Sequence, residues 1–469
     1  MVFSSLSFLF RFLPLFLAVY YILPVKYRNL CLFLGSILFY AFGEPVYVVL
    51  IICSLLFNYS MGLLMGEYAR KRALRIALLL FTLSINFGLL LFFKYSDFLI
   101  DNINLCSRLY FHNEASLSGL KLGLPLGISF YTFQISSYII DVYYKKYPAE
   151  KNLLSVGVYL CMFPQLIAGP IITYPELSSD IKHRTYSKIL FEDGLQIFIL
   201  GLGSKVILAN RIGILWHDLQ TIGYDSLTTP LAWMGAFAYT FQLYFDFYGY
   251  SLMAVGLGKM LGFKLPNNFD HPYLSYSMTD FFRKWHMTLG RWFREYIYIP
   301  LGGNRKGGLR TICNLLFVWL LTGFWHGASW NFVLWGVVVG ILIILEKFIW
   351  GGFLKKHRLI SFLYMTFLVP LTWSLFAITN IANIKVFFCR LFHIGFQSTL
   401  LNTDNLLAYI KTFGFLFVCC LLCMTYLPDR LFHKYRKKPL GILAILAIFW
   451  ISVYFLANSI NNPFLYFRF

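Results

Sequence analysis

The chain has 469 residues, of which 59% are hydrophobic, 20% aromatic and only 13% charged. A soluble protein has no means of hiding so much apolar surface, and the many apolar runs of spanning length predict a multi-pass membrane protein instead. The formal net charge of +20 gathers in the loops between these runs, which is typical of cytoplasmic basic loops and argues against nucleic-acid binding, since no soluble domain is there to carry it.

No polar linker separates the apolar runs, so we expect a single all-α membrane body over residues 1–469 and no bound cofactor or metal. Nine cysteines occur, most of them inside apolar runs. The one CxxC spacing, Cys420 to Cys423, has no second pair, so neither a zinc site nor a disulfide framework is indicated. The first run, 8–23, lacks a small-residue cleavage site and is interpreted as a spanning helix.

Clusters of Lys and Arg between the runs predict the topology, because the cytoplasmic loops of membrane proteins are enriched in these residues. If every cluster is cytoplasmic, an even number of spans separates each cluster from the next. The spans expected on this basis, in chain order, are 8–23, 30–42, 46–65, 73–93, 124–140, 189–214, 231–261, a hairpin at 311–350, 360–378, 406–427 and 441–456. This predicts about a dozen spans and places both termini on the extracytoplasmic side.

Residues 153–173 are the exception, because only one apolar run lies there between two basic clusters. Pro164 and the triplet Ala168-Gly169-Pro170 interrupt the run. A re-entrant hairpin would restore the parity, and irregular backbone is tolerated at membrane depth where protein buries it. A misassigned loop explains the pattern equally well, so both interpretations stay open.

His326 lies in LTGFWHGASW, inside an apolar hairpin. An intramembrane histidine is rare and usually faces a cavity or the interior of the bundle. Burial keeps such a ring neutral and able to accept a proton. Gly323 and Gly327 flank it and are expected to leave room for a substrate. A histidine that merely joins two helices through a carbonyl is an equally good interpretation of the residues alone.

His286 lies in RKWHMTLGRWFREY, an amphipathic segment with an aromatic face and a basic face. Such a surface suits a phosphate-bearing ligand, and the glycine-rich GGNRKGG at 302–308 adds possible backbone donors. The basic residues expected to hold this ligand are Arg283, Arg291, Arg305 and Lys306. The residues alone favour the plainer alternative, an interfacial loop on the cytoplasmic side. GGNRKGG does not match GxxxxGK[ST], so no ATPase motif is present.

Two acidic residues, Asp246 and Glu346, lie in apolar runs, where carboxylates are costly. Asp246 is expected either to orient a ligand or to form a structural ion pair. The C-terminal segment 458–469, NSINNPFLYFRF, is predicted to be an extracytoplasmic tail. Its aromatic residues suit either insertion into a cavity of the membrane body or anchoring at the interface.

The stretch WHMTLGRWFREYIYIPLGGNR, followed by TGFWHGASWNFVLWG, resembles the membrane-bound O-acyltransferase (MBOAT) family. The bacterial branch with the alginate O-acetyltransferase membrane subunit, the peptidoglycan O-acetyltransferase and the D-alanyl-teichoic-acid transfer protein is most similar. LPLGISFYTFQ (124–134), FPQLIAGPI (163–171) and the run 245–273 match it too. The resemblance implies the MBOAT fold, with a motif core at 120–350 and re-entrant segments around a central funnel or tunnel. FDFYGYSLMA departs from the alginate-type FDFSGYSDMA, which weakens alginate as the acceptor.

The resemblance also implies roles for individual residues. His326 matches the family's essential histidine and would act as general base, while His286 matches the second position of the pair. Tyr466 matches a C-terminal tyrosine thought to carry the acyl group. Acetyl-CoA is the implied donor, and an extracytoplasmic SGNH-type acyltransferase is the implied partner that reaches a cell-surface polysaccharide. The implied location is the bacterial inner membrane, in contact with the lipid bilayer.

A transporter or flippase of the same export pathway is the competing interpretation. It would use the basic loop and Asp246 for binding, without covalent chemistry. Transporters often show matched halves with broken helices, and no such repeat is visible in this sequence. A structural scaffold for an export complex is a third possibility.

Overall fold

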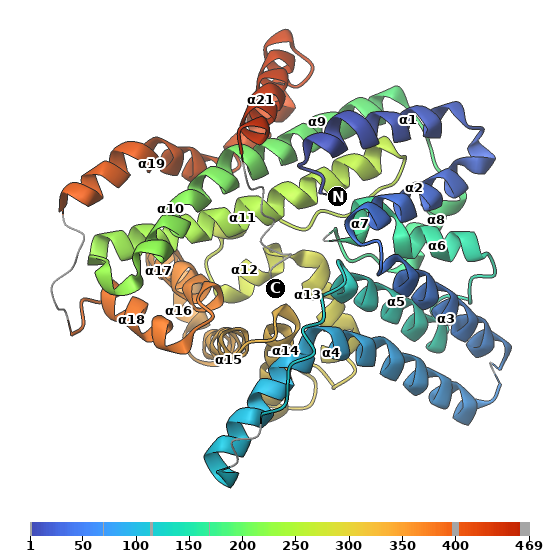
Figure 1. Cartoon of the computed structure of the whole chain (residues 1–469), viewed down its shortest axis with the longest axis horizontal. Helices are drawn as coiled ribbons and strands as arrows, with labels where there is room; N and C mark the ends of the chain where they lie inside the picture. Colours follow the sequence, from blue (N-terminus) through green and yellow to red (C-terminus); the bar gives the residue numbers. More distant parts are fainter. Residues whose placement is uncertain (1, 69, 113–115, 168, 396–402, 460–469) are drawn as a thin grey trace. The chain divides into compact units, whose positions relative to one another are not determined.

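The computed structural model describes residues 2–68, 70–112, 116–167, 169–395 and 403–459, and over these residues it contains helices and no strand (Figure 1). The all-α prediction is therefore confirmed. Contacts divide the chain into two compact units, Met1–Leu195 with Ala254–Pro266 and Gln196–Met253 with Asn267–Phe469. We call them the first and the second unit. The expectation of a single body over 1–469 stays a prediction.

The first unit holds the N-terminal helices. They are η1 (Phe8–Phe12), α1 (Leu13–Ile22), η2 (Val25–Tyr27), α2 (Arg28–Gly43), α3 (Val48–Glu67), α4 (Arg72–Phe111), α5 (Ile128–Tyr143), α6 (Leu153–Cys161), α7 (Phe163–Leu166), α8 (Tyr174–Lys182) and the beginning of α9 (Lys188–Gly203). The end of α11 (Thr229–Met260) also belongs to this unit.

The second unit holds the remaining helices. They are η3 (Ser204–Ala209), α10 (Asn210–Ile222), η4 (Tyr224–Ser226), most of α11, η5 (Pro272–Leu274), α12 (Met278–Lys284), α13 (Met287–Phe293), η6 (Arg294–Tyr298), α14 (Gly308–His326), α15 (Trp330–Leu345), η7 (Glu346–Trp350), α16 (Gly351–Lys356), α17 (Arg358–Ala377), α18 (Ile381–Leu391), α19 (Thr403–Cys423), α20 (Leu427–Tyr435) and α21 (Pro439–Ala457).

Eight helical segments of the described residues are long and apolar enough to cross a membrane, and the shorter apolar run Phe8–Ile22 precedes them. The protein is thus a multi-pass membrane protein, whereas the count of about a dozen spans is not confirmed. Two of the expected spans show why. The helices α2 and α5 have 16 residues each, or about 24 Å at 1.5 Å per residue. That falls short of a hydrocarbon core of about 30 Å.

The segment 153–173 forms short buried helices. α6 has nine residues and α7 has four, and a nine-residue helix spans only about 14 Å. The side chains from Val158 to Phe163 are fully buried, so protein shields the broken backbone around Pro164. Gly127, with φ +75, lies where a Cβ would come within 2.6 Å of the Leu166 carbonyl oxygen. This close packing favours the re-entrant interpretation over a misassigned loop.

Candidate active site

His286 occupies the turn between α12 and α13. It is the N-cap residue of α13 and has φ 45 and ψ 53, in the left-handed region. That conformation costs a residue with a Cβ roughly 1–2 kcal/mol and persists only where the surroundings enforce it. Two backbone hydrogen bonds do so, from Met287 N to the Asn268 carbonyl (2.9 Å) and from Asp270 N to the Lys284 carbonyl (3.0 Å).

The side chain of Asn268 fixes the orientation of the His286 ring. Its Oδ1 lies 3.2 Å from His286 Nδ1 and also accepts hydrogen bonds from Thr288 N (3.3 Å) and Thr288 Oγ1 (2.7 Å). Because a backbone N–H only donates, the atom facing Thr288 must be the oxygen. His286 Nδ1 therefore carries the ring proton, and Nε2 carries the lone pair. This arrangement presents Nε2 as the basic nitrogen.

Aromatic side chains enclose the same ring. His286 is only 2% exposed, and burial lowers its pKa to about 3, which keeps it neutral at pH 7. Its ring centroid lies 4.7 Å from that of Phe247 and 6.3 Å from that of Trp325. A neutral, buried imidazole of this kind accepts a proton only transiently, as a general base or hydrogen-bond acceptor does.

His326 is the last residue of α14 and is 7% exposed. Its ring packs edge-on against Trp335 of α15 at 5.2 Å and Phe376 of α17 at 5.1 Å, and it lies 4.9 Å from its neighbour Trp325. Trp325 thus contacts both histidines. The structure brings the two predicted catalytic residues into contact with one indole side chain, within a single unit.

The glycines beside His326 serve helix packing. A Cβ on Gly323 would lie 2.3 Å from the Phe332 carbonyl oxygen, and one on Gly327 would lie 2.2 Å from the Phe332 ring. On α15, a Cβ at Gly336 would lie 2.4 Å from the Trp319 carbonyl oxygen. Backbones in close contact join α14 to α15, which lie side by side in Figure 1. The expectation that these glycines leave room for a substrate was wrong, because Phe332 fills that room.

Glu346 anchors the helix that leads to His286. Its side chain is 4% exposed, and its two oxygens accept hydrogen bonds from Met278 N (2.6 Å), Thr279 N (3.0 Å), Thr279 Oγ1 (2.9 Å) and Tyr364 Oη (3.2 Å). A carboxylate at the first N–H groups of α12 satisfies donors that have no partner inside the helix and complements the helix dipole. Capping of α12 therefore explains why Glu346 is buried in an otherwise apolar run.

Asp246, the other buried acid, forms an ion pair with Lys205. Asp246 Oδ1 lies 2.5 Å from Lys205 Nζ, which also donates to Asn210 Oδ1 at 3.0 Å. The side-chain exposures are 0% for Lys205 and 3% for Asp246. Their helices meet at Gly201 and Gly249, where an added Cβ would lie within 2.6 Å of the opposite carbonyl oxygen. The ion-pair alternative for Asp246 is confirmed.

The residues predicted to hold a phosphate-bearing donor lie on α12, α13 and the loop before α14. Arg283, Arg305 and Lys306 are exposed, and Arg291 is half-buried. In the glycine-rich loop, the N–H groups of Gly302, Gly303 and Arg305 already donate to carbonyls within residues 298–302. The remaining N–H groups and the cationic side chains are what the loop offers to an anion. Phosphate binding here stays a prediction.

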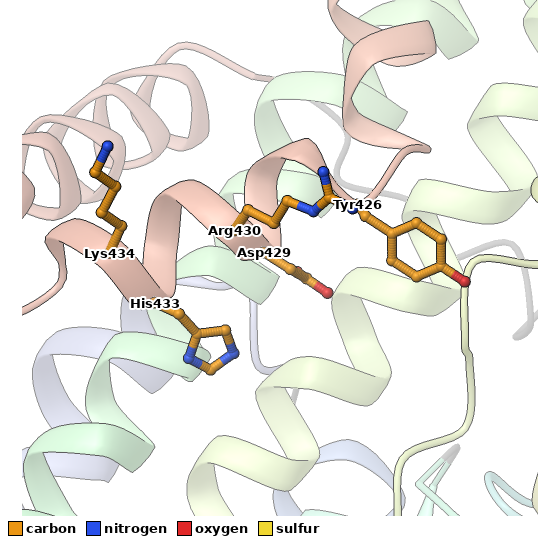
Figure 2. Close-up of a pocket in the computed structure, with 5 residues that line it drawn as sticks. All are labelled: Tyr426, Asp429, Arg430, His433 and Lys434. Atoms are coloured by element: carbon orange, nitrogen blue, oxygen red, sulfur yellow. The ribbon is translucent and has the colours of Figure 1, made fainter.

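The segment Leu427–Tyr435 carries a second basic cluster, which a cavity of about 640 Å³ adjoins. Tyr426, Asp429, Arg430, His433 and Lys434 line it, and in Figure 2 Lys434 and His433 project to opposite sides of the helix. Asp429 lies 3.3 Å from Nε2 of His271, whose ring packs 4.0 Å from Tyr426. His271 thereby joins α20 to the loop that carries Asn268.

Comparison with known proteins decides the family. Residues 145–379 match the family described as MBOAT, membrane-bound O-acyltransferase family. The chain belongs to this family. A probable alginate O-acetylase of Pseudomonas putida is 35% identical over 100% of both chains. One of Pseudomonas aeruginosa is 38% identical, covering 87% of this chain and 78% of the relative. A peptidoglycan O-acetyltransferase of Helicobacter pylori is 34% identical, covering 82% and 78%.

This MBOAT protein is therefore a membrane-embedded O-acyltransferase, as the motifs around its two histidines indicate. Both histidines lie inside the matched residues. Tyr466, the predicted acyl carrier, lies outside the described residues. Asn268 and Lys205 were missed by the sequence analysis. The only signal for Asn268 was its place in the run 245–273, and Lys205 was visible only as a lone cation in an apolar run.

Proposed function

We propose that this MBOAT protein transfers an acetyl group, or another small acyl group, from a cytoplasmic donor across the membrane for O-acylation of a cell-surface polysaccharide. The names of the relatives support an acetyl group, since they describe an alginate O-acetylase and a peptidoglycan O-acetyltransferase. The observation that carries the proposal is the buried pair His286 and His326, whose rings both pack near Trp325.

The proposed reaction needs a base, an acyl donor and a hydroxyl. His326 takes the proton from the phenol of Tyr466, and the phenolate oxygen attacks the thioester carbonyl of acetyl-CoA. The carbon–sulfur bond breaks, the thiol of CoA leaves with a proton, and an acetyl ester remains on the tyrosine. General base catalysis of this kind contributes roughly 10²–10⁴-fold in rate, and the covalent ester divides one difficult transfer into two easier ones.

His286 is proposed to orient the donor or assist proton transfer through Nε2, the nitrogen that Asn268 leaves with the lone pair. Arg283, Arg291, Arg305 and Lys306 are proposed to bind the phosphates of the CoA donor, since guanidinium and ammonium groups pair with phosphate. An extracytoplasmic SGNH-type acyltransferase is the proposed partner that moves the group from Tyr466 to the polymer. The proposed location is the bacterial inner membrane, with both termini extracytoplasmic.

Replacement of His326 by Ala tests the catalytic assignment. We expect cells with this variant to lose polymer acylation by at least a hundredfold while the protein stays in the membrane at the wild-type level. His217→Ala is the matched control, because His217 is exposed on α10. Full acylation in the His326→Ala strain would refute the proposal.

A labelling experiment separates the enzyme from the transporter. Inside-out vesicles incubated with acetyl-CoA labelled in the acetyl group should yield a C-terminal peptide with a labelled ester on Tyr466, and Tyr466→Phe should abolish the label. A transporter would leave the peptide unmodified. Labelling with acetyl-CoA also tests the proposed donor directly, and its absence with a functional protein would remove CoA from the mechanism.

A further inference from the structure

A long groove runs between α1 and α2 in the first unit. Its lining residues lie between positions 2 and 42, far from His286 and His326 in the sequence. Its volume is about 1110 Å³. Side chains four residues apart form its two walls. One wall is Arg11, Leu15 and Val19 on η1 and α1 with Leu23 just after α1, and the other is Leu30, Leu34, Leu38 and Phe42 on α2. Residues at such spacing lie in one row along a helix. The groove therefore follows the length of the helical hairpin seen at the start of the chain in Figure 1.

The floor of the groove is fixed by close contact between the two helices. A Cβ on Gly35 would lie 2.5 Å from the ring of Phe16, so the helices touch there. The row of phenylalanines next to this wall on the first helix packs against the protein core. Phe8, Phe12 and Phe16 pack against Phe163 with ring centroids 6.3, 5.6 and 5.2 Å away. The contacts with Phe163 thus hold the first helix in place, while the side chains of the two groove walls stay exposed.

The walls are apolar and uncovered. Leu15 is 69% exposed, Leu34 is 56% exposed and Phe42 is 65% exposed. Water is a poor occupant for such a surface, because apolar cavities offer it no hydrogen-bonding partners. In a membrane protein, the material at hand to cover these side chains is hydrocarbon.

One end of the groove is cationic. Arg11 lies in the first turn, η1, with Ser5 and Ser7 nearby in the lining. Arg11 is exposed, forms no hydrogen bond or ion pair with any described residue, and no Asp or Glu lines the groove. An arginine in an apolar helix is costly unless it meets a counter-charge. Its planar guanidinium is well suited to a phosphate group, which it binds through two parallel hydrogen bonds.

Arg11 lies near the start of the apolar segment Phe8–Ile22, so its long side chain is able to reach toward the membrane interface. The five residues of η1 and the ten of α1 span about 22 Å, less than a hydrocarbon core of about 30 Å. A short apolar helix is accommodated by local thinning and by side chains that reach toward the interface. The groove thus has apolar walls along its length and one positively charged side chain, Arg11, at one end.

We propose that this groove is a specific binding site for one anionic phospholipid, with an acyl chain between the two leucine-rich walls and the phosphate on Arg11. The preference for an anionic over a zwitterionic headgroup follows from the lining, which has a guanidinium and no carboxylate to meet an ammonium group. The site is separate from the acyl-transfer chemistry, so it does not depend on the proposed function.

Native mass spectrometry of the purified, delipidated full chain tests the site. Titration with dioleoyl phosphatidylglycerol should show one lipid retained at least tenfold more tightly than dioleoyl phosphatidylcholine. Arg11→Gln should remove that difference, since a charge-assisted bond is lost. Arg72→Gln is the matched control, because Arg72 is an exposed arginine at the start of α4 and lies outside the groove.

A second variant separates the groove from the charge. Leu34→Trp fills the groove with an indole and should weaken retention of both lipids, whereas Leu80→Trp, on the exposed face of α4, should not. The proposal is overturned if Arg11→Gln and Leu34→Trp bind phosphatidylglycerol like the wild type. It is also overturned if Arg72→Gln loses as much binding as Arg11→Gln, or if crosslinking in membranes from Leu34→Cys captures a second protein helix in the groove.

Discussion

Replacement of Glu346 by Gln tests whether α12 is held in place by the carboxylate from η7. A side-chain amide offers one acceptor oxygen where the carboxylate offers two, so about half of the four hydrogen bonds to Met278, Thr279 and Tyr364 are lost. At about 1.5 kcal/mol for each bond to a charged group, the expected loss of stability is about 3 kcal/mol. Tyr364→Phe removes one bond and should cost about half as much.

The expected effect on catalysis is larger than on folding, because α12 leads into the turn that carries His286. Displacement of a catalytic group by about 1 Å lowers turnover on the order of a hundredfold. The assay is acyl transfer by purified protein, normalised to the folded fraction from size-exclusion chromatography, together with the midpoint of thermal inactivation. We expect kcat to fall in Glu346→Gln while KM for the donor changes little.

Glu150→Gln, in the first unit, is the control for a generic loss of a buried carboxylate. Glu150 is 9% exposed, accepts a hydrogen bond from Tyr174 Oη at 2.8 Å and pairs with Lys182 at 2.9 Å. It should lose stability with kcat unchanged in the folded fraction. An equal fall in kcat in both variants, or an unaltered Glu346→Gln, would refute the reasoning.

Three further predictions concern contacts in the second unit. Asn268→Ala removes the acceptor that orients the neighbouring imidazole and should lower kcat roughly 10–100-fold, whereas an unchanged kcat would exclude that role. Lys205→Met removes the cation beside Asp246 and should destabilise the protein by about 3–5 kcal/mol; the double variant with Asp246→Leu should recover most of this loss, as measured by thermal inactivation. Asp429 raises the pKa of His271 above its ordinary 6.5, so this contact stabilises the fold below pH 6.5 and is lost as pH rises through the raised pKa. Stability in Asp429→Asn should therefore vary less with pH over that interval, and an identical profile would contradict the assignment.

Much of the architecture could be predicted from the sequence, because a helix that crosses a lipid bilayer must be apolar over a minimum length. Apolar length predicted the membrane class, and His326 stood out because a histidine is costly in an apolar run. The count of spans is not confirmed, since helices such as α5 are shorter than the bilayer yet buried by protein, with 14 of the 16 residues of α5 buried. A run of apolar residues has the same composition in either setting.

The arrangement of the site was less accessible, since it depends on pairs of residues far apart in the chain. Asn268 and His286 are 18 residues apart, and Glu346 and Met278 are 68 residues apart. Two of the four donors to Glu346 are backbone N–H groups, which every residue type except proline possesses, so no residue pattern marks them. Gly323 and Gly327 show a different error. Their lack of a side chain correctly indicated a close approach, but the group that approaches them is Phe332 and not a ligand.

The helix α15 is in contact with the surroundings of both histidines. Trp335, near its start, packs on His326, and Glu346, directly after its end, caps the helix that leads to His286. A helix of this length behaves as a stiff rod, so a sideways push at one end is transmitted to the other. We therefore expect a displacement of α15 to disturb the surroundings of both imidazoles together.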